Sequence, residues 1–235
     1  MIHIVIAGVY PIAHALGSAM SQNCNPKIYG VSCGADVTAV DTHDKDVLIW
    51  FRKEKTGAAQ NYWQLIKQYV LPQARDEDII AFLDGDDRLI GTAALEPVLK
   101  AYQDREVMIT HGSYRKKSGN VFRFGGAYRS NDVFREEIWR ATHLKTVRVK
   151  LWKYLPEYCM KEQDGVTWLK TCSDLAMMFP LLEMAGNDRI KFIQQEIYEY
   201  NDENPDNDHK IHGDQQALTE TWLRQQPSFK RLETV

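Results

Sequence analysis

The chain of 235 residues contains little cysteine and no hydrophobic run long enough to cross a membrane. Its four cysteines form no Cys-x-x-Cys pair and no zinc-binding spacing, so reduced thiols in a cytoplasmic setting are expected. Because a membrane-spanning helix needs about 20 apolar residues, any membrane contact would be peripheral. The apolar N-terminus, residues 1–7, lacks a basic leader and is soon interrupted by Pro11 and His14. It predicts a first strand rather than a signal peptide.

Charge is distributed unevenly along the chain. The net charge is −3, but residues 115–153 hold eleven Lys and Arg against three acids, a local balance of +8 that leaves −11 for the rest. Such a basic segment predicts an anionic partner: a nucleotide diphosphate, a lipid pyrophosphate, a membrane surface or a nucleic acid. A solvated helix face explains the same composition equally well, and the sequence leaves both interpretations open.

Apolar strand-like runs alternate with helical patterns through the first half of the chain. The strand-like runs are 3–9, 27–32, 46–51, 78–83 and 106–111, and the helical patterns are 12–22, 58–71 and 92–103. Strands that alternate with helices favour parallel pairing through right-handed crossovers. The predicted fold class is therefore α/β, with a doubly wound, mostly parallel sheet flanked by helices.

The pattern changes beyond Gly112. A turn is predicted at residues 118–120, helices within 136–154, a helix over 175–185 that ends at Gly186, a strand over 190–200 and a last helix over 214–226. Nothing in this half demands a second independent domain. We expect a single domain over 1–235, made of a first half, 1–112, and a smaller second region, 113–235.

The most informative feature is an acidic cluster at the end of a predicted buried strand. The apolar run 79–83 leads directly into Asp84-Gly85-Asp86-Asp87. In an open α/β sheet, ligands bind beyond the carboxyl ends of the strands. Clustered carboxylates repel one another unless a cation compensates them, and Mg²⁺ or Mn²⁺ bridging to a phosphate is one solution. This pattern indicates an enzyme that handles a nucleotide or a sugar phosphate, although an acidic β-turn is the simpler alternative.

Several motifs, taken in order, resemble a GT-A glycosyltransferase, and most of all glycosyltransferase family 2. Residues 18–22 resemble the family's Ser-x-x-x-Gln helix end, 34–36 its Gly-Ser-x-Asp turn, 57–61 its Gly-x-x-x-Asn element, 82–87 its Asp-x-Asp motif and 173–174 its late acidic position. The tail over 200–208 is similar to that of small viral and phage enzymes of this type. One departure is that Ser32 and Cys33 stand where the family has acidic residues, the first of which helps to hold the nucleotide base.

The resemblance implies transfer of a sugar from a nucleotide-sugar donor, UDP-linked, to a hydroxyl of a glycan or glycoprotein. It implies a GT-A fold whose first half binds the donor and whose second half faces the acceptor, in the cytoplasm, including that of a virus-infected host cell. It also implies Mn²⁺ or Mg²⁺ as the cofactor. The implied donor-binding residues are Val9, Tyr10, Asp36, Gly57, Asn61, Asp84 and Gly85.

The resemblance also assigns roles to individual acids. Asp86 is the expected principal metal ligand, Asp84 contacts the metal through water or binds the ribose, and His212 completes the metal shell. Asp87 receives no role, since a third acid in such a loop often faces solvent. Asp174 is the expected catalytic base of an inverting enzyme, although an Asp in this position is also a common helix N-cap.

Three alternatives remain open from the residues. The basic segment favours an acceptor that carries phosphate, either DNA with a modified base or a lipid-linked sugar. A haloacid-dehalogenase-like phosphatase also places Asp-x-Asp after a strand, but Arg88 stands where that class has Thr or Val. A catalytically silent metal- or sugar-binding module is the third alternative.

Overall fold

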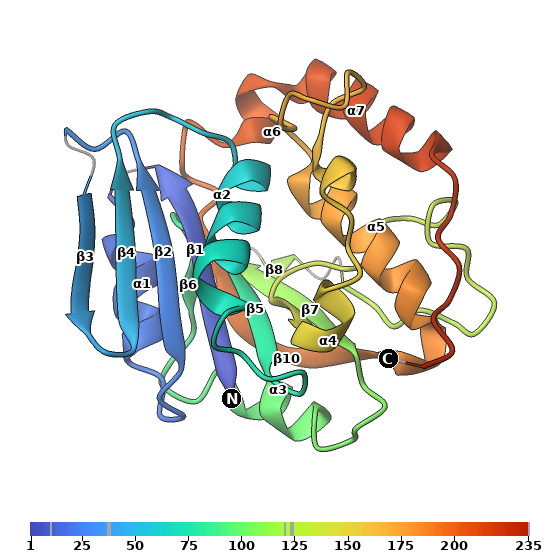
Figure 1. Ribbon diagram of the computed structural model, residues 1–235, viewed down its shortest axis with the longest axis horizontal. Helices are drawn as coiled ribbons and strands as arrows, with labels where there is room; N and C mark the ends of the chain where they lie inside the picture. The colour runs from blue at the N-terminus through green and yellow to red at the C-terminus, as the bar shows by residue number, and fades with distance from the viewer. Residues whose placement is uncertain (10, 37–38, 120, 123–124, 235) are drawn as a thin grey trace.

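Ten strands form one mixed sheet in the part of the chain that the computed structural model describes, residues 1–9, 11–36, 39–119, 121–122 and 125–234 (Figure 1). The strands are β1 (Ile2–Val9), β2 (Lys27–Cys33), β3 (Ala39–Asp44), β4 (Val47–Arg52), β5 (Ile79–Asp84), β6 (Arg88–Leu89), β7 (Ile109–Lys116), β8 (Val121–Phe122), β9 (Lys145–Arg148) and β10 (Ile190–Tyr200). Their order is β3-β4-β2-β1-β5-β9-β7-β10-β6, and β8 pairs with β7.

The predicted parallel pairing holds for the block β4-β2-β1-β5, where each neighbouring pair is parallel. Strands β7 and β10 form a further parallel pair, while β9 lies antiparallel to both β5 and β7. The helical elements are α1 (Ala13–Met20), α2 (Ala58–Leu65), η1 (Ile66–Val70), α3 (Glu96–Ala101), α4 (Val149–Trp152), η2 (Glu157–Met160), α5 (Ser173–Ala185), η3 (Asn187–Arg189), α6 (Asp208–Ile211) and α7 (Gly213–Gln225). The α/β class with helices on both faces of the sheet is confirmed.

The segment 136–154 corrects one prediction. It was expected to hold helices, but residues 145–148 form β9, and α4 is a single turn. All four residues of β9 are buried, and the strand fills the space between β5 and β7. The β-branched Thr146 and Val147 suit a strand. Lys145 and Arg148 argued against a buried strand, because charged side chains are rarely buried without partners.

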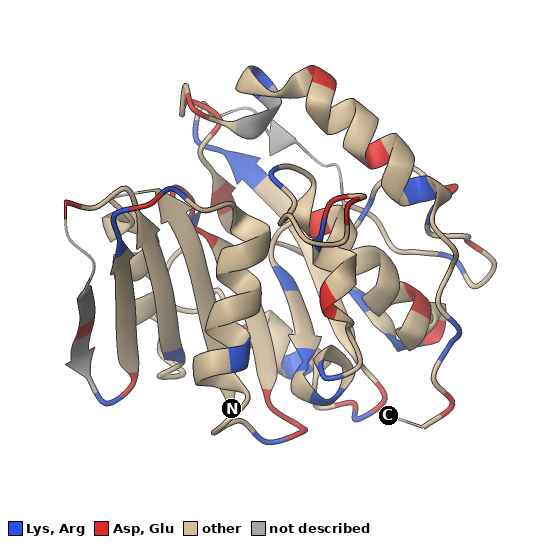
Figure 2. Ribbon diagram, turned by 45° about the horizontal axis from the view of Figure 1, so that its top comes forward, with Lys and Arg blue, Asp and Glu red and all other residues tan. Residues whose placement is uncertain are grey.

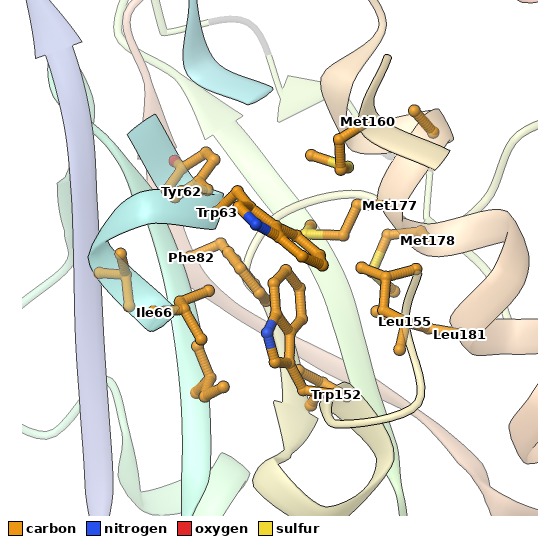
Figure 3. Packing of buried hydrophobic residues seen from close by; sticks show 14 of the residues in the cluster. Tyr62, Trp63, Ile66, Phe82, Trp152, Leu155, Met160, Met177, Met178 and Leu181 are labelled. Carbon is orange, nitrogen blue, oxygen red and sulfur yellow. The ribbon is translucent and has the colours of Figure 1, made fainter. Parts of the chain in front are cut away.

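Alternate residues of the central strands supply two separate cores, one on each face of the sheet. In β1, Ile4 and Ile6 join the cluster under α1 and α3, while Val5 and Ala7 join the cluster under α2 and α5. The second cluster is rich in large rings, and Figure 3 shows Trp63, Phe82 and Trp152 meeting the methionines of α5. The Trp152 ring centroid lies 5.6 Å from that of Phe82. This packing fixes α5 against the sheet.

Helix α5 and its surroundings follow the predicted boundaries. The helix ends at Ala185, and Gly186 follows with a φ of 80°, a conformation that glycine adopts without steric cost. Strand β10 and helix α7 then return the chain across the sheet and over α5 (Figure 1). Among the described helices, none combines the length and the apolarity that a bilayer crossing requires.

Candidate active site

Two glycines bring the acidic loop against the end of the first strand. The Gly85 N–H donates to the Ala7 carbonyl oxygen at 2.8 Å, and a Cβ added to Gly85 would lie only 2.6 Å from the Gly8 Cα. A side chain at either glycine would therefore separate the two segments. Gly85 was predicted as a donor-binding residue, and Gly8 had no assigned role. Their close approach places residues 84–87 at the carboxyl edge of the parallel block.

Asp84, Asp87 and His143 converge at this edge. One ligand atom from each side chain lies within 4.8 Å of the ligand atoms of the other two, a spacing that could hold a metal ion. The Nδ1 atom of His143 is 3.8 Å from an Asp84 carboxylate oxygen. His143 lies two residues before β9. The position of β9 beside β5 therefore places this side chain near the acidic loop. No motif around residue 143 indicates the role.

Asp87 is buried, although a solvent-facing position was expected for it. Its two carboxylate oxygens accept hydrogen bonds from the Tyr198 hydroxyl at 2.6 Å and from the Asn201 N–H at 2.7 Å. Burial, followed by the charges of Asp84 and Asp86, raises the pKa of Asp87 well above its usual range. A cation bound between the carboxylates would reverse this effect, since an opposite charge favours the ionised form.

Tyrosine side chains hold the other two members of the group. The Tyr62 hydroxyl donates to an Asp84 oxygen at 2.7 Å. The Tyr198 ring stacks on the His143 imidazole, with centroids 4.6 Å apart and planes inclined by 17°. Burial, with the nearby Lys145 charge as the second cause, lowers the pKa of His143 well below 6.5. The imidazole is therefore neutral at physiological pH.

Lys145 connects this group to Asp174. Its side chain is only 5% exposed, and its ammonium lies 3.2 Å from the His143 Nδ1 and 3.9 Å from an Asp174 carboxylate oxygen. Asp174 occupies the first turn of α5, where the helix dipole favours a negative charge, and its side chain is 37% exposed. It is not the N-cap of the helix, because Cys172 occupies that position and makes no side-chain capping bond. Sequence reasoning found Asp174 but gave Lys145 no role.

Asn61 and Gly57, both predicted to shape the donor pocket, have structural contacts in this region. Asn61 is buried in α2, where its amide donates to the Thr56 carbonyl and to the Cys33 sulfur, and its oxygen accepts from the Thr56 hydroxyl. A Cβ on Gly57 would lie 3.1 Å from the Leu169 carbonyl oxygen. These contacts join the start of α2 to the ends of β2 and of the segment before α5.

The remaining predicted site residues lie at the surface or outside the described chain. Val9 and Asp36 are exposed, at the end of β1 and just after β2, along the same carboxyl edge. Asp86 is exposed and accepts a hydrogen bond from the Asn204 side chain at 2.6 Å. His212 is exposed just before α7 and is not part of the metal-spaced group found among the described residues. Tyr10 lies outside the described residues.

Comparison with solved structures places the fold. Three structures of S. aureus TarS match the chain. A complex of residues 1–349 with UDP is 17% identical, covers 95% of this chain and 64% of that chain, and has a TM-score of 0.57. A second structure of residues 1–349 is 16% identical, covers 86% of this chain and 60% of that one, and has a TM-score of 0.51. The longest is 16% identical, covers 85% of this chain and 36% of that one, and has a TM-score of 0.54.

The chain has a GT-A-like glycosyltransferase fold. It spans between 36% and 64% of the lengths of these structures, and at this identity the similarity concerns the fold. No protein-family model matches the chain. No curated protein matches it either. The resemblance to small viral and phage enzymes gains no support from these comparisons.

Within this GT-A-like fold, most cations of the basic segment 115–153 pair with acids of the same chain. Among the described residues, at least eight of its eleven cations form ion pairs, and seven of these eight have acidic partners outside the segment. The paired residues are Arg115, Lys117, Arg135, Arg140, Lys145, Arg148, Lys150 and Lys153. Figure 2 shows basic and acidic segments interspersed over this half of the ribbon. The excess of +8 therefore gives no support to a nucleic acid or a lipid pyrophosphate as the partner.

Proposed function

We propose that the protein is a glycosyltransferase that moves a sugar from a UDP-linked donor to a hydroxyl group of a glycan or glycoprotein. The observation that carries this proposal is the convergence of Asp84, Asp87 and His143 at the carboxyl edge of the parallel block. That edge is where open α/β sheets bind their ligands. Support also comes from the UDP named in the TarS complex, whose fold this chain shares over 95% of its length.

The chemistry of the convergent group fits a divalent cation. Two carboxylates and one neutral imidazole suit Mn²⁺ better than Mg²⁺, which prefers oxygen ligands and water. When bound, the cation stabilises the charge that develops on the departing nucleotide diphosphate. We assign Asp84, Asp87 and His143 as its protein ligands. The roles of Asp86 and His212 as ligands stay predictions, since both are exposed and lie outside this group.

We assign the base to Asp174. Its carboxylate takes the proton of the acceptor hydroxyl, the hydroxyl oxygen bonds to the anomeric carbon, and the nucleotide diphosphate leaves with the bonding electrons. Attack from the face opposite the leaving group inverts the anomeric centre. Lys145 supplies a counter-charge on the side of Asp174 that faces the acidic loop. A buried ammonium at this distance orients the carboxylate.

The remaining donor contacts are proposed along the same edge. Val9, Asp36 and Gly85 line the ends of β1, β2 and β5, while Gly57 and Asn61 support the wall formed by α2. The first half, 1–112, then holds the donor and the second half, 113–235, faces the acceptor within one domain. The cytoplasmic location inferred from the cysteines stays a prediction.

Nucleotide release provides the test. The protein is incubated with Mn²⁺ and a panel of UDP-, GDP- and CMP-sugars, and the freed nucleotide is measured for the wild type, Asp87→Asn and Asp174→Asn. We expect slow release from a UDP-sugar that needs Mn²⁺ and Asp87. Transfer to a sugar acceptor should fall about 10³-fold in Asp174→Asn, while UDP binding by calorimetry stays unchanged.

Two outcomes would overturn the proposal. One is the absence of any nucleotide binding with or without Mn²⁺, and the other is release that Asp87→Asn leaves intact. Hydrolysis of a simple phosphoester such as p-nitrophenyl phosphate, abolished by Asp84→Asn, would favour the phosphatase instead.

A further inference from the structure

A second cavity lies beside the helix that carries Asp174. It has a volume of about 540 Å³ and is bounded by α5, α7, the turn η2 and the C-terminal segment 226–230. None of Asp84, Asp87, His143 or Lys145 lines it. Its size is typical of ligand-binding pockets, which range from about 300 to 1,000 Å³. The cavity is therefore separate from the proposed donor and metal site.

Four aromatic side chains line the cavity. Tyr158 is 64% exposed at the rim, and its ring stacks near that of Phe229 with planes inclined by 19°. Trp222 is half-buried on the α7 side, and Phe179 forms the floor from α5. Such rings present flat apolar faces of low conformational entropy. The C–H faces of sugar rings pack on surfaces of this kind.

Polar groups beside these rings are free to bind a ligand. The Gln163 amide, the Trp222 indole N–H and the Lys230 ammonium make no hydrogen bond or ion pair with the part of the chain that the structure describes. The Gln226 amide donates to the Trp222 carbonyl, which leaves its own oxygen as an acceptor. Sugar hydroxyls can bind these groups, whereas an alkyl chain makes no hydrogen bond with them.

The position of the cavity connects it to the proposed reaction. Leu175 and Ala176 line it, and they directly follow Asp174 in the first turn of α5. Asp174 faces Lys145 of the sheet, whereas Ala176, Phe179 and Pro180 face the cavity on the other side of α5, so a long ligand in the cavity reaches the base around the start of the helix. We infer that the cavity binds sugar residues of an oligosaccharide acceptor and so holds its reacting end near Asp174. Its role as an acceptor site rests on the proposed glycosyltransferase function, while its affinity for sugars does not.

Direct binding tests the sugar site by itself. Tryptophan fluorescence is followed while chitin-, cellulose-, xylan- and galactan-derived oligosaccharides of one to six units are added to the full chain. We expect saturation with at least one oligosaccharide of three or more units, and a loss of affinity of about tenfold or more in Tyr158→Ala and in Gln163→Ala. Both residues are exposed, so these variants should fold. Tyr154→Ala, at a tyrosine 52% exposed outside the cavity, should bind like the wild type.

Three results would overturn the inference. They are the absence of saturable binding by any of these sugars up to about 10 mM, binding that Tyr158→Ala and Gln163→Ala leave unchanged, and binding of a decyl chain in preference to every sugar.

A second measurement separates this inference from the proposed function. UDP binding in the presence of Mn²⁺ is measured by calorimetry in the wild type and in Tyr158→Ala, and both should be equal. If neither binds UDP while the sugars still bind, the transferase proposal fails and the sugar site stands. If UDP binds but Tyr158→Ala raises the KM for a six-unit acceptor no more than that for a single sugar, the acceptor role of the cavity fails.

Discussion

The acidic loop 84–87 and the basic segment 115–153 differ in how their charges are placed in the structure. Asp84 and Asp87 of the loop converge, and burial together with the charges of Asp84 and Asp86 raises the pKa of Asp87. The cations of the segment are separated, and most contact an acid from elsewhere in the sequence. The candidate site therefore coincides with carboxylates that have no cation between them. The more numerous cations of the basic segment mostly have acidic partners and stabilise the fold.

This difference has a simple physical origin. Gathering like charges at a buried position costs free energy, so it is retained where a ligand can repay that cost. Ion pairs between distant segments instead satisfy each buried cation with a partner and join elements of the fold. The count of charges in a segment cannot distinguish the two cases, because the partners are far away in the sequence.

Neutralising the acidic loop should have the largest effect on function. We expect Asp87→Asn to lower nucleotide release about 10³-fold, because it removes a proposed ligand. The same change should leave the free energy of unfolding equal or raise it by about 1 kcal/mol in the absence of metal, since it relieves a buried repulsion. Release assays and urea denaturation measure the two effects.

Asp86→Asn is the matched control in the same loop. Because its carboxylate is exposed, we expect the substitution to lower nucleotide release less than about tenfold. If Asp86→Asn causes the larger loss and Asp87→Asn the smaller, the assignment from the sequence resemblance is right and the geometric one fails.

Lys145 is where the basic segment reaches the acidic site. Lys145→Met removes the ammonium between His143 and Asp174, so we expect transfer to fall about 10²-fold while the Kd for UDP changes little. Lys145→Arg should restore part of the rate by keeping the charge. Lys150→Met, in the same segment but paired with Glu77, should keep the wild-type rate. Equal losses in Lys145→Met and Lys150→Met would contradict the assignment.

Substitutions in the ion pairs away from the site should lower the free energy of unfolding rather than the activity. Arg148 is buried, pairs with Glu77, and donates to the carbonyl oxygens of Val107 and Tyr102. We expect Arg148→Met to lower the free energy of unfolding by about 3 kcal/mol, because it leaves buried acceptors without donors. Urea denaturation gives the value.

The exposed pair of Lys153 and Asp76 provides the contrast within the same segment. Lys153→Met should cost about 0.5 kcal/mol or less, because solvent screens an exposed ion pair. A loss as large as that in Arg148→Met would mean that exposure does not decide the contribution of these pairs.

His111 in β7 gives a smaller, pH-dependent effect on the same scaffold. Burial is the main cause that lowers its pKa to about 4, from an ordinary value of 6.5. Below pH 6.5 the unfolded chain binds a proton that the folded protein does not, so stability falls as the pH drops towards 4. At pH 5 this loss amounts to about 2 kcal/mol.

His111→Phe tests this effect. The difference in free energy of unfolding between pH 7.5 and pH 5 should shrink by about 2 kcal/mol in the variant. The same pH dependence in the variant and in the wild type would show that another group is responsible.

The sequence predicted the elements that have strong local patterns. Strands β1, β2, β4 and β5 appear where apolar runs were found, and α5 ends at the predicted glycine. It failed for residues 145–148, because burial of Lys145 and Arg148 depends on partners that are distant in the chain. The acidic loop was found because its carboxylates are adjacent in sequence, whereas His143 lies about 60 residues away and has no motif around it.

The sequence by itself determined the α/β alternation and the position of three carboxylates at the end of a buried strand, because both are properties of neighbouring residues. The tertiary structure decided which of those carboxylates face each other, and it added His143 and Lys145 to them. It also decided that the basic segment is compensated within the protein. These outcomes depend on β9 lying between β5 and β7, an arrangement of distant segments that no local pattern encodes.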